Sequence, residues 1–206
     1  PNGVDEKLFE IKLPKEVAQN ELALKNIVNF DLWRRANHFL LYTGSFKTKG
    51  VEKGIGCILK SLKYLNNSFH FIAVGGSSED IDFYKNLSKE LGVSDKVTFL
   101  GRVYQADLAL FQCACDIMLM PFPKLAHYEY FMSPLKMFEY MYSGRSIIAS
   151  DLPSIKEVLN EKNAFFVKSD DAKGLSEQIL YVVNNPEIAL QKTQNAEFDI
   201  KKYTWT

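Results

Sequence analysis

The stretch Lys96–Pro121, KVTFLGRVYQADLALFQCACDIMLMP, contains the repeating unit of this chain. A short apolar run rich in β-branched and aromatic residues (96–101) is followed by a helical pattern (106–114) and a second apolar run (116–121). Such runs predict strands, and an intervening helix connects them in parallel. Because both runs are apolar almost throughout, each strand is expected in a sheet that is covered on both faces.

The same alternation continues along the chain. Further apolar runs lie at 39–44, 70–75, 146–150 and 164–168, and further helical patterns at 51–65, 81–91, 134–143, 154–159 and 172–183. We therefore predict an α/β fold with a doubly wound parallel sheet, Rossmann-like in its architecture.

The two ends of the chain depart from this alternation. Residues 1–20 predict a turn and an irregular segment, residues 21–35 an amphipathic helix, and Pro186 begins a long helix in the tail. We therefore divide the chain into a leading segment (1–35), a Rossmann-like domain (36–185) and a C-terminal helix (186–206). Because the chain begins at Pro1 rather than at methionine, we expect a piece of a longer protein.

Composition excludes several classes of function. The 206 residues carry 25 basic and 25 acidic side chains, whereas nucleic acids and anionic membranes are bound by surfaces with an excess of Lys and Arg. No apolar run reaches the roughly 18 residues of a membrane span, and the first residues do not have the pattern of a signal peptide.

Cysteines and histidines do not suggest a metal site. There are three cysteines, without the spacing of a zinc site or a disulfide framework, which fits a reducing compartment. Cys113 and Cys115 lie in an apolar stretch and are predicted to be buried packing residues. The three histidines are far apart in the sequence, and Asp80 and Asp82 at a helix start are predicted to be capping acids.

The helix at 134–143 poses an electrostatic question. Ser133 suits its N-cap, Pro134 its first position and Gly144 its end. Lys136 then lies in the first turn, where the helix dipole disfavours a cation by a few tenths of a kcal/mol. Glu139 on the same polar stripe, or a bound phosphate, would supply the missing anion. Leu135, by contrast, is expected on the apolar side of this helix.

Ligands of doubly wound sheets bind outside the carboxyl ends of the strands, close to helix N-termini. Glycines lie at three of these predicted strand ends, and Ser133 and Lys136 follow the fourth. The long connection 122–132 lies at the same edge, where long loops often carry function. The sequence therefore predicts one crevice at this edge.

Six strings of the chain, taken in order, carry a family resemblance: PNGVD, YTGSFKTKGVE, FIAVGG, VTFLGRV, CDIMLMP and SPLKMFEYMYSGRSIIASDLPSIKEVL. They resemble the C-terminal, donor-binding domain of a GT-B fold retaining glycosyltransferase, of the group 1 family that includes glycogen synthases and sucrose synthases. The last string, which begins at Ser133, is the most specific.

The resemblance implies an activity. It implies transfer of a hexose from a UDP- or GDP-linked sugar to an acceptor hydroxyl, with retention at the anomeric carbon and without a metal cofactor. A glycan or lipid-linked acceptor would be held by an N-terminal domain, so this domain alone would bind donor with little turnover. The expected setting is polysaccharide biosynthesis in the cytoplasm, at the inner face of the membrane in the intact enzyme.

The resemblance also assigns roles to residues. Lys49 would meet the diphosphate as charge builds on the leaving group, and Glu139 would hold the ribose hydroxyls. The diphosphate would lie on the helix N-terminus, at Ser133, Pro134, Leu135 and Lys136. Close backbone approach and contacts to the base would come from Gly44, Gly75, Gly76, Gly101, Arg102 and Val103.

Two positions depart from the family pattern. Ser45 stands where many members have an arginine that contacts the diphosphate, and Phe131 stands where the first of two glutamates meets the donor sugar. Glu129 would compensate for the second change if the loop shifts. Ser45 and Phe131 favour an alternative, a non-catalytic relative that binds a nucleotide sugar or a partner. A sugar-nucleotide epimerase of the same fold is the other alternative, and base and sugar stay open.

Overall fold

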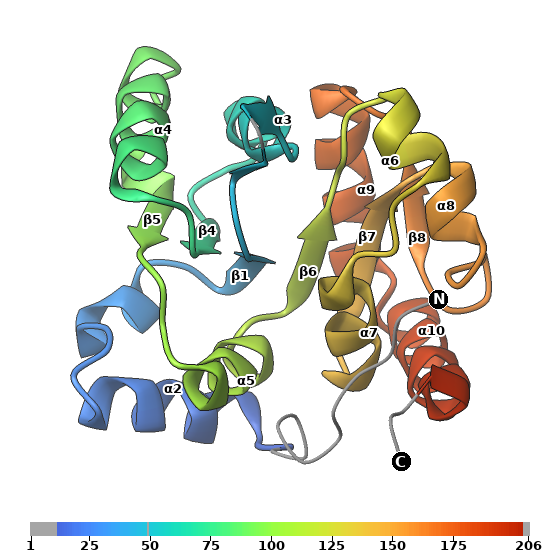
Figure 1. Ribbon diagram of the computed structural model, residues 1–206. Coiled ribbons are helices and arrows are strands. Elements are labelled where there is room, and N and C mark those ends of the chain that lie inside the picture. The colour runs from blue at the N-terminus through green and yellow to red at the C-terminus, as the bar shows by residue number, and fades with distance from the viewer. Residues whose placement is uncertain (1–11, 49, 204–206) are drawn as a thin grey trace.

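A six-stranded parallel sheet forms the centre of the protein (Figure 1). The computed structural model describes residues 12–48 and 50–203. Side by side, the strands follow the order β5-β4-β1-β6-β7-β8. The chain therefore winds outward from β1 in one direction and then from β6 in the other, which is the doubly wound order and confirms the predicted fold. The strands are β1 (His38–Thr43), β4 (Phe69–Val74), β5 (Val97–Leu100), β6 (Ile117–Met120), β7 (Ser146–Ser150) and β8 (Phe165–Val167).

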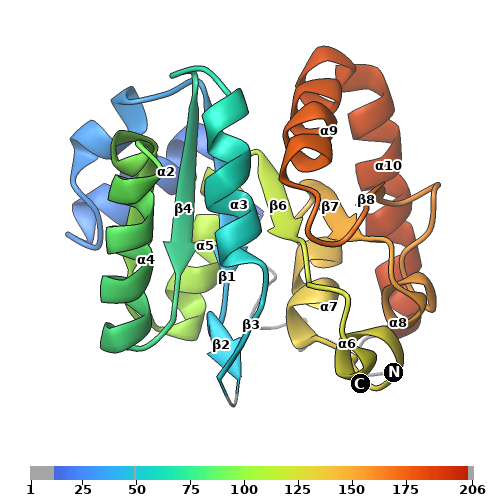
Figure 2. The same ribbon diagram turned by 90° about the horizontal axis from the view of Figure 1, so that it is seen from above.

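Helices cover both faces of the sheet, as Figure 2 shows. Alternate residues of β1 explain why: Phe39 and Leu41 belong to one buried cluster, and Leu40 and Tyr42 to the other. The first face is covered by α2 (Lys15–Leu24), α5 (Gln105–Ala114) and α7 (Leu135–Tyr142), and the second by α3 (Ile55–Ser61), α4 (Ser78–Glu90) and α9 (Ala172–Asn184).

The remaining elements are short or peripheral. A small antiparallel hairpin, β2 (Lys47–Thr48) and β3 (Val51–Glu52), follows β1. The other α-helices are α6 (Ala126–Tyr130), α8 (Pro153–Lys156) and α10 (Pro186–Asp199), and the 3-10 helices are η1 (Phe30–Arg34), η2 (Leu62–Tyr64), η3 (Ser94–Lys96) and η4 (Ile200–Tyr203). The helix predicted to begin at Pro186 is confirmed, and it packs against α7, α9 and β7.

The prediction for the leading segment was wrong in two respects. Residues 15–20 are helical rather than irregular, because Ala18 and Leu22 bury one side of α2 against α5. The helix predicted over 21–35 ends at Leu24 instead, and Asn26 has a left-handed backbone with φ 55° that does not continue a helix. Only the short η1 turn follows before β1.

Two further predictions change in detail. The helix expected at 51–65 begins at Ile55, because Val51 and Glu52 pair with the preceding strand of the hairpin. The connection 122–132, expected as a loop, contains α6. The buried positions of Cys113 and Cys115 are confirmed. Within the described residues, none of the helices is both long and apolar enough to cross a membrane.

Candidate functional site

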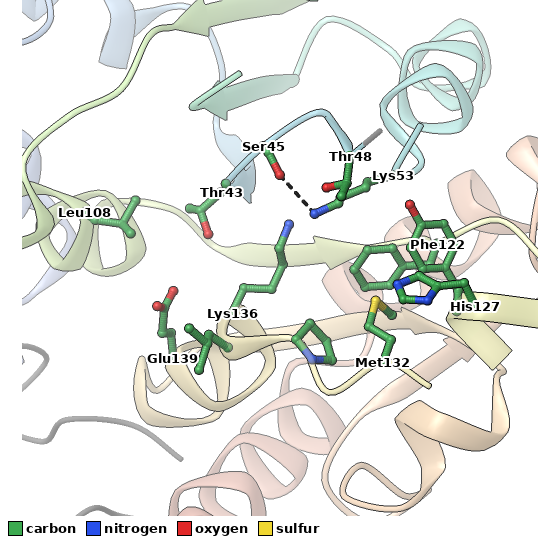
Figure 3. A pocket seen from close by; sticks show the side chains of 14 residues that line it. Thr43, Ser45, Thr48, Lys53, Leu108, Phe122, His127, Met132, Lys136 and Glu139 are labelled. Carbon is green, nitrogen blue, oxygen red and sulfur yellow. Dashed lines mark hydrogen bonds between the residues drawn. The ribbon is translucent and has the colours of Figure 1, made fainter. Parts of the chain in front are cut away.

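A cavity of about 390 Å³ opens at the carboxyl ends of β1 and β6. Figure 3 shows its side chains, which come from the end of β1, the β2–β3 hairpin region, α5, the connection after β6 and the start of α7. Its lining consists of Thr43, Gly44, Ser45, Thr48, Lys53, Leu108, Phe122, His127, Tyr128, Met132, Pro134, Leu135, Lys136 and Glu139. The cavity lies where ligands of doubly wound sheets bind.

Tyr140 anchors α7 beside the end of β1. The backbone N–H of Thr43 donates to the Tyr140 hydroxyl oxygen at 2.8 Å, and the Thr43 side-chain hydroxyl lies 3.1 Å from the same oxygen. Burial raises the pKa of Tyr140, so its phenol stays neutral. These bonds hold α7 against the end of β1, beside the cavity.

Lys136 is buried at the N-terminus of α7 and forms no ion pair with any described residue. Its side chain is 9% exposed, and its Nζ lies 3.5 Å from the centroid of the Tyr42 ring. Among the described residues, Nζ has no hydrogen-bond partner. Burial lowers the pKa of Lys136 well below its usual value, and the nearby Lys53 cation lowers it further. A cation in this position is stabilised when an anion enters the cavity.

Glu139 lines the same cavity but does not pair with Lys136. Burial raises the pKa of the Glu139 carboxyl, while the Lys136 charge opposes that rise. In Figure 3 the Lys136 side chain points toward the hairpin side of the cavity, whereas Glu139 lies to one side, near Leu108. The alternative in which Lys136 is an exposed lysine paired with Glu139 is therefore wrong.

The start of α7 differs from the prediction. Pro134 rather than Ser133 occupies the N-cap position, with an extended backbone and no side-chain hydrogen bond to the helix. Leu135, expected on the apolar side, is 49% exposed, whereas Lys136, expected on the polar stripe, is buried. The reason is that α7 packs between the end of β1 on one side and α10 and η4 on the other.

A second cavity of about 350 Å³ adjoins the first and shares Gly44, Ser45 and Leu108 with it. Arg102, Val103, Gly75 and Gly76 line this second cavity. Gly75 has φ 117°, and a Cβ there would lie 2.3 Å from the Gly44 carbonyl oxygen, so backbone packing alone requires glycine. Gly76 likewise has no room for a Cβ beside the Phe46 ring, whereas Gly101 has open space around it.

Of the residues singled out in the sequence, Glu129 and Phe131 line neither of these two cavities. Lys49 lies outside the described residues, so its prediction stays untested. Glu129 lies 3.8 Å from Lys124 and lines a different cavity, near Asp151. Phe131 is 77% exposed and lines neither of the two cavities described above.

Sequence reasoning missed several lining residues. Lys53, Thr48, Phe122 and His127 face the cavity, and Lys53 donates to the Ser45 hydroxyl oxygen at 2.9 Å. Lys53 follows a hairpin that the sequence did not reveal. The clearest available signal was that the short segment 47–53 contains three lysines. No group of three or more His, Cys, Asp or Glu side chains in the described part of the chain could hold a metal ion.

Comparison with protein families gives a match over most of the chain. The model of the family described as Glycosyl transferases group 1 matches residues 37–185. A curated relative from Campylobacter jejuni, N,N'-diacetylbacillosaminyl-diphospho-undecaprenol alpha-1,3-N-acetylgalactosaminyltransferase, is 28% identical over 74% of this chain and 38% of its own length. The O-antigen chain mannosyltransferase RfbU of Salmonella typhimurium is 27% identical over 74% and 40%. The chain thus spans about two fifths of the length of these relatives.

Solved structures share the fold. Sucrose-phosphate synthase from Thermosynechococcus elongatus has a TM-score of 0.78 at 23% identity, covering 100% of this chain and 48% of that one. HepE from Anabaena, in complex with UDP-glucose, has a TM-score of 0.76 at 17% identity, covering 98% and 51%. The C-terminal domain of the group 1 protein LpcC from Francisella tularensis has a TM-score of 0.74 at 18% identity, covering 99% and 100%.

Proposed function

The chain belongs to the glycosyl transferases group 1 family, and from this membership and the geometry of the cavity we propose that it is the donor-binding domain of a retaining glycosyltransferase. The reaction we propose is transfer of a hexose from a nucleotide-diphosphate sugar to an acceptor hydroxyl. The single observation that carries the proposal is Lys136, buried at the N-terminus of α7, whose Nζ has no hydrogen-bond partner in the described part of the chain.

An anion of the size and charge of a diphosphate fits what surrounds Lys136. The N-terminus of a helix carries about half a positive charge and directs free backbone N–H groups outward. Leu135 and Lys136 are the first residues of α7, and Lys136 adds a full charge when protonated. Both face a cavity of about 390 Å³, and Glu139 is the one acidic side chain among the described residues that line it. The site is therefore net positive at the place where phosphate would bind.

The rest of the donor has surfaces of matching chemistry. A carboxylate accepts two hydrogen bonds from a diol, so we assign the ribose to Glu139. The adjoining cavity, at Arg102 and Val103, would take the base. HepE, which shares this fold, is described in complex with UDP-glucose, and this supports a nucleotide sugar as the ligand here.

We propose that positive charge supplied by the protein stabilises the leaving group. Lys136 and the α7 N-terminus would stabilise the diphosphate as the bond to the sugar breaks, which is the role that a metal cation has in other transferases. Lys49 would join them by its position in the family pattern. No general base is assigned, because the leaving phosphate itself would accept the proton of the acceptor hydroxyl.

The names of two relatives support a proposal about the acceptor and the location of the enzyme. One is named for an undecaprenol-linked substrate and another for the O-antigen chain. We therefore propose a glycan or lipid-linked acceptor, bound outside this chain, and an enzyme that works in the cytoplasm at the inner face of the membrane.

Product analysis tests the proposal. The translation product that contains this chain is incubated with UDP-, GDP- and ADP-hexoses and a lipid-linked or glycan acceptor, and the product is examined by NMR. We expect one donor to be consumed and its anomeric configuration to be kept. An inverted product contradicts retention, and a donor returned with inverted C2 identifies an epimerase. Binding of donor without turnover identifies the non-catalytic alternative, for which the exposed Phe131 is the supporting observation.

A further inference from the structure

A separate cavity of about 610 Å³ opens at the carboxyl ends of β7 and β8. Among the described residues, it shares no lining side chain with the two cavities of the donor site. Because β7 pairs with both β6 and β8, β8 lies two strand spacings, or about 10 Å, from β6 along the same edge of the sheet. The polar lining of this cavity consists of Lys124, Glu129, Asp151, Lys156, Lys168 and Ser169.

The walls of this cavity are α6, α8 and the turn that follows β8, and hydrogen bonds hold them together. Helices α6 and α8 lie side by side (Figures 1 and 2), and the Ser154 hydroxyl of α8 donates to the Tyr128 carbonyl oxygen of α6. The backbone N–H of Asp151 donates to the Val167 carbonyl oxygen at 2.9 Å, which joins the ends of β7 and β8. The cavity is therefore preformed, and a ligand does not have to order its walls.

The Glu129 carboxylate is available to a ligand in this cavity. Its side chain is 17% exposed, and the Lys124 Nζ lies 3.8 Å away, beyond hydrogen-bond distance. Asp151 on the facing wall differs, because it lies 2.8 Å from the Lys156 ammonium group. The Glu129 oxygens therefore keep their capacity to accept hydrogen bonds, in a position sheltered from bulk water.

Ser169 adds a hydroxyl group to the same cavity. Its Oγ is buried and has no hydrogen-bond partner among the described residues. Burying a hydroxyl without a partner costs free energy, and a ligand that donates to it or accepts from it recovers that cost. The neighbouring Lys168 is exposed and supplies a cation at the rim.

This mixture of groups matches the chemistry of a sugar. Each sugar hydroxyl both donates and accepts, so it pairs with the carboxylates of Glu129 and Asp151 and with the lysines. Leu152 and Pro153 add an apolar surface for the C–H groups of a sugar ring. A phosphate group fits less well, because two carboxylates on the walls repel it.

We propose that this cavity binds one sugar unit of the acceptor glycan, with Glu129 and Ser169 as hydrogen-bonding partners of its hydroxyls. This inference rests on the proposed function. The reacting end of the acceptor stays outside this chain, and the cavity binds a unit further along the same glycan. Glu129 then contacts a sugar, as the sequence suggested, but one that belongs to the acceptor instead of the donor.

Neutral trisaccharides of glucose, of mannose and of N-acetylglucosamine are the probes that test this site. Titration followed by saturation-transfer NMR uses the 206-residue chain, which corresponds over its length to a separately solved C-terminal domain. Wild type is compared with Glu129→Gln, Ser169→Ala and the control Glu177→Gln, which changes an exposed position of α9. UDP, GDP and ADP are titrated in parallel, and thermal unfolding is measured for each variant.

We expect at least one trisaccharide to bind wild type with a Kd of about 1 mM. Glu129→Gln should weaken it about 10-fold, because a charged acceptor is lost, and Ser169→Ala about 3-fold. Ser169→Ala should unfold at the same or a higher temperature than wild type, because its hydroxyl has no protein partner to lose. Glu177→Gln should match wild type in every measurement.

The outcomes separate this inference from the proposed function. If nucleoside diphosphates bind and none of the trisaccharides does, the acceptor site is overturned while the donor site stands. Equal trisaccharide affinity in Glu129→Gln and wild type overturns it too, and so does a Glu129→Gln variant that loses affinity for the nucleoside diphosphate instead. If trisaccharide binding depends on Glu129 and nucleoside diphosphates do not bind, the glycan site is supported and the donor site is overturned.

Discussion

Two lysines at opposite ends of β1 have different surroundings. At the amino end, Lys15 Nζ lies 2.8 and 2.7 Å from the two carboxylate oxygens of Asp116 and 3.1 Å from the Asn37 carbonyl oxygen. Asp116 also accepts from the backbone N–H of Phe39 at 2.7 Å. At the carboxyl end, Lys136 is more deeply buried and has no such partner among the described residues.

From this difference we infer that Lys15 has a structural role and that Lys136 binds a ligand. A buried charge is tolerated when the protein supplies its counter-ion, as Asp116 does for Lys15. A buried charge without a counter-ion lowers stability, unless a ligand completes the pair. The amino end of the sheet is therefore internally satisfied, whereas the carboxyl end is complementary to an anion.

The pH dependence of stability that His70 causes would sharpen this contrast at the amino end of the sheet. His70 lies 2.9 Å from the Thr98 hydroxyl, and burial lowers its pKa from 6.5 to about 4. The unfolded chain takes up a proton as pH falls through 6.5 and the folded chain only near 4, so stability is lost as pH falls across that window. We expect up to about 3 kcal/mol of loss from this group. Urea unfolding at several pH values, with His70→Asn as the comparison, should show a flatter dependence for the variant.

Removing the cation at the amino end gives the next effect. Lys15→Met leaves the Asp116 carboxylate half-buried and unpaired, and we expect a loss of about 2 kcal/mol in the free energy of unfolding. The affinity for nucleoside diphosphates should not change, because Lys15 lies at the other edge of the sheet. The matched control is Lys173→Met, which removes the exposed pair with Glu177 at 3.6 Å and should cost less than about 0.5 kcal/mol. A Lys15 variant as stable as the control would break the comparison.

A substitution of Glu139, at the carboxyl end of the sheet, tests which part of the donor this residue binds. Glu139→Gln should weaken a nucleoside diphosphate about 10-fold, or about 1.4 kcal/mol, because ribose hydroxyls lose a charged acceptor. Pyrophosphate, which has no ribose, should bind at least as well as to wild type. Glu177→Gln, at an exposed position of α9, is the control. Equal losses for both ligands would contradict the assignment of the ribose to Glu139.

The smallest expected effect has the opposite sign from that of Lys15. Lys136→Met keeps the length of the buried side chain and removes its charge, so the unliganded protein should be more stable by about 1 kcal/mol. The lost contact with the Tyr42 ring offsets part of the gain. Chemical unfolding without ligand measures it, and a destabilised variant would mean that Lys136 has a structural role after all.

The fold could be predicted from the sequence because each strand has a local sequence signal, a short apolar run. Runs such as residues 71–75 and 117–121 are apolar over their whole length, which is typical of a sheet buried on both faces. The first part of α2, residues 15–20, was missed because its buried side consists of little more than Ala18 and Leu22, and this is a weak periodic signal. What makes it a helix is the contact with α5, far along the chain.

Part of the candidate site could be predicted because its sequence signal is also local. Lys136 was identified from its position at a helix N-terminus, which is local information. Its burial depends on the Tyr42 ring and on the packing of α7 against the end of β1, and these are tertiary contacts. Lys53 gave no comparable signal, because it enters the cavity only through the hairpin that follows β1.

The most direct test of the account is calorimetric titration of wild type, Lys136→Met and Lys15→Met with UDP, GDP and ADP. We expect one of these nucleoside diphosphates to bind wild type and Lys15→Met with the same micromolar to millimolar Kd. Lys136→Met should bind it about 100-fold more weakly, a change of about 2.7 kcal/mol. Unchanged affinity in Lys136→Met would contradict the claim that this lysine is unpaired because its counter-ion is the phosphate of the ligand.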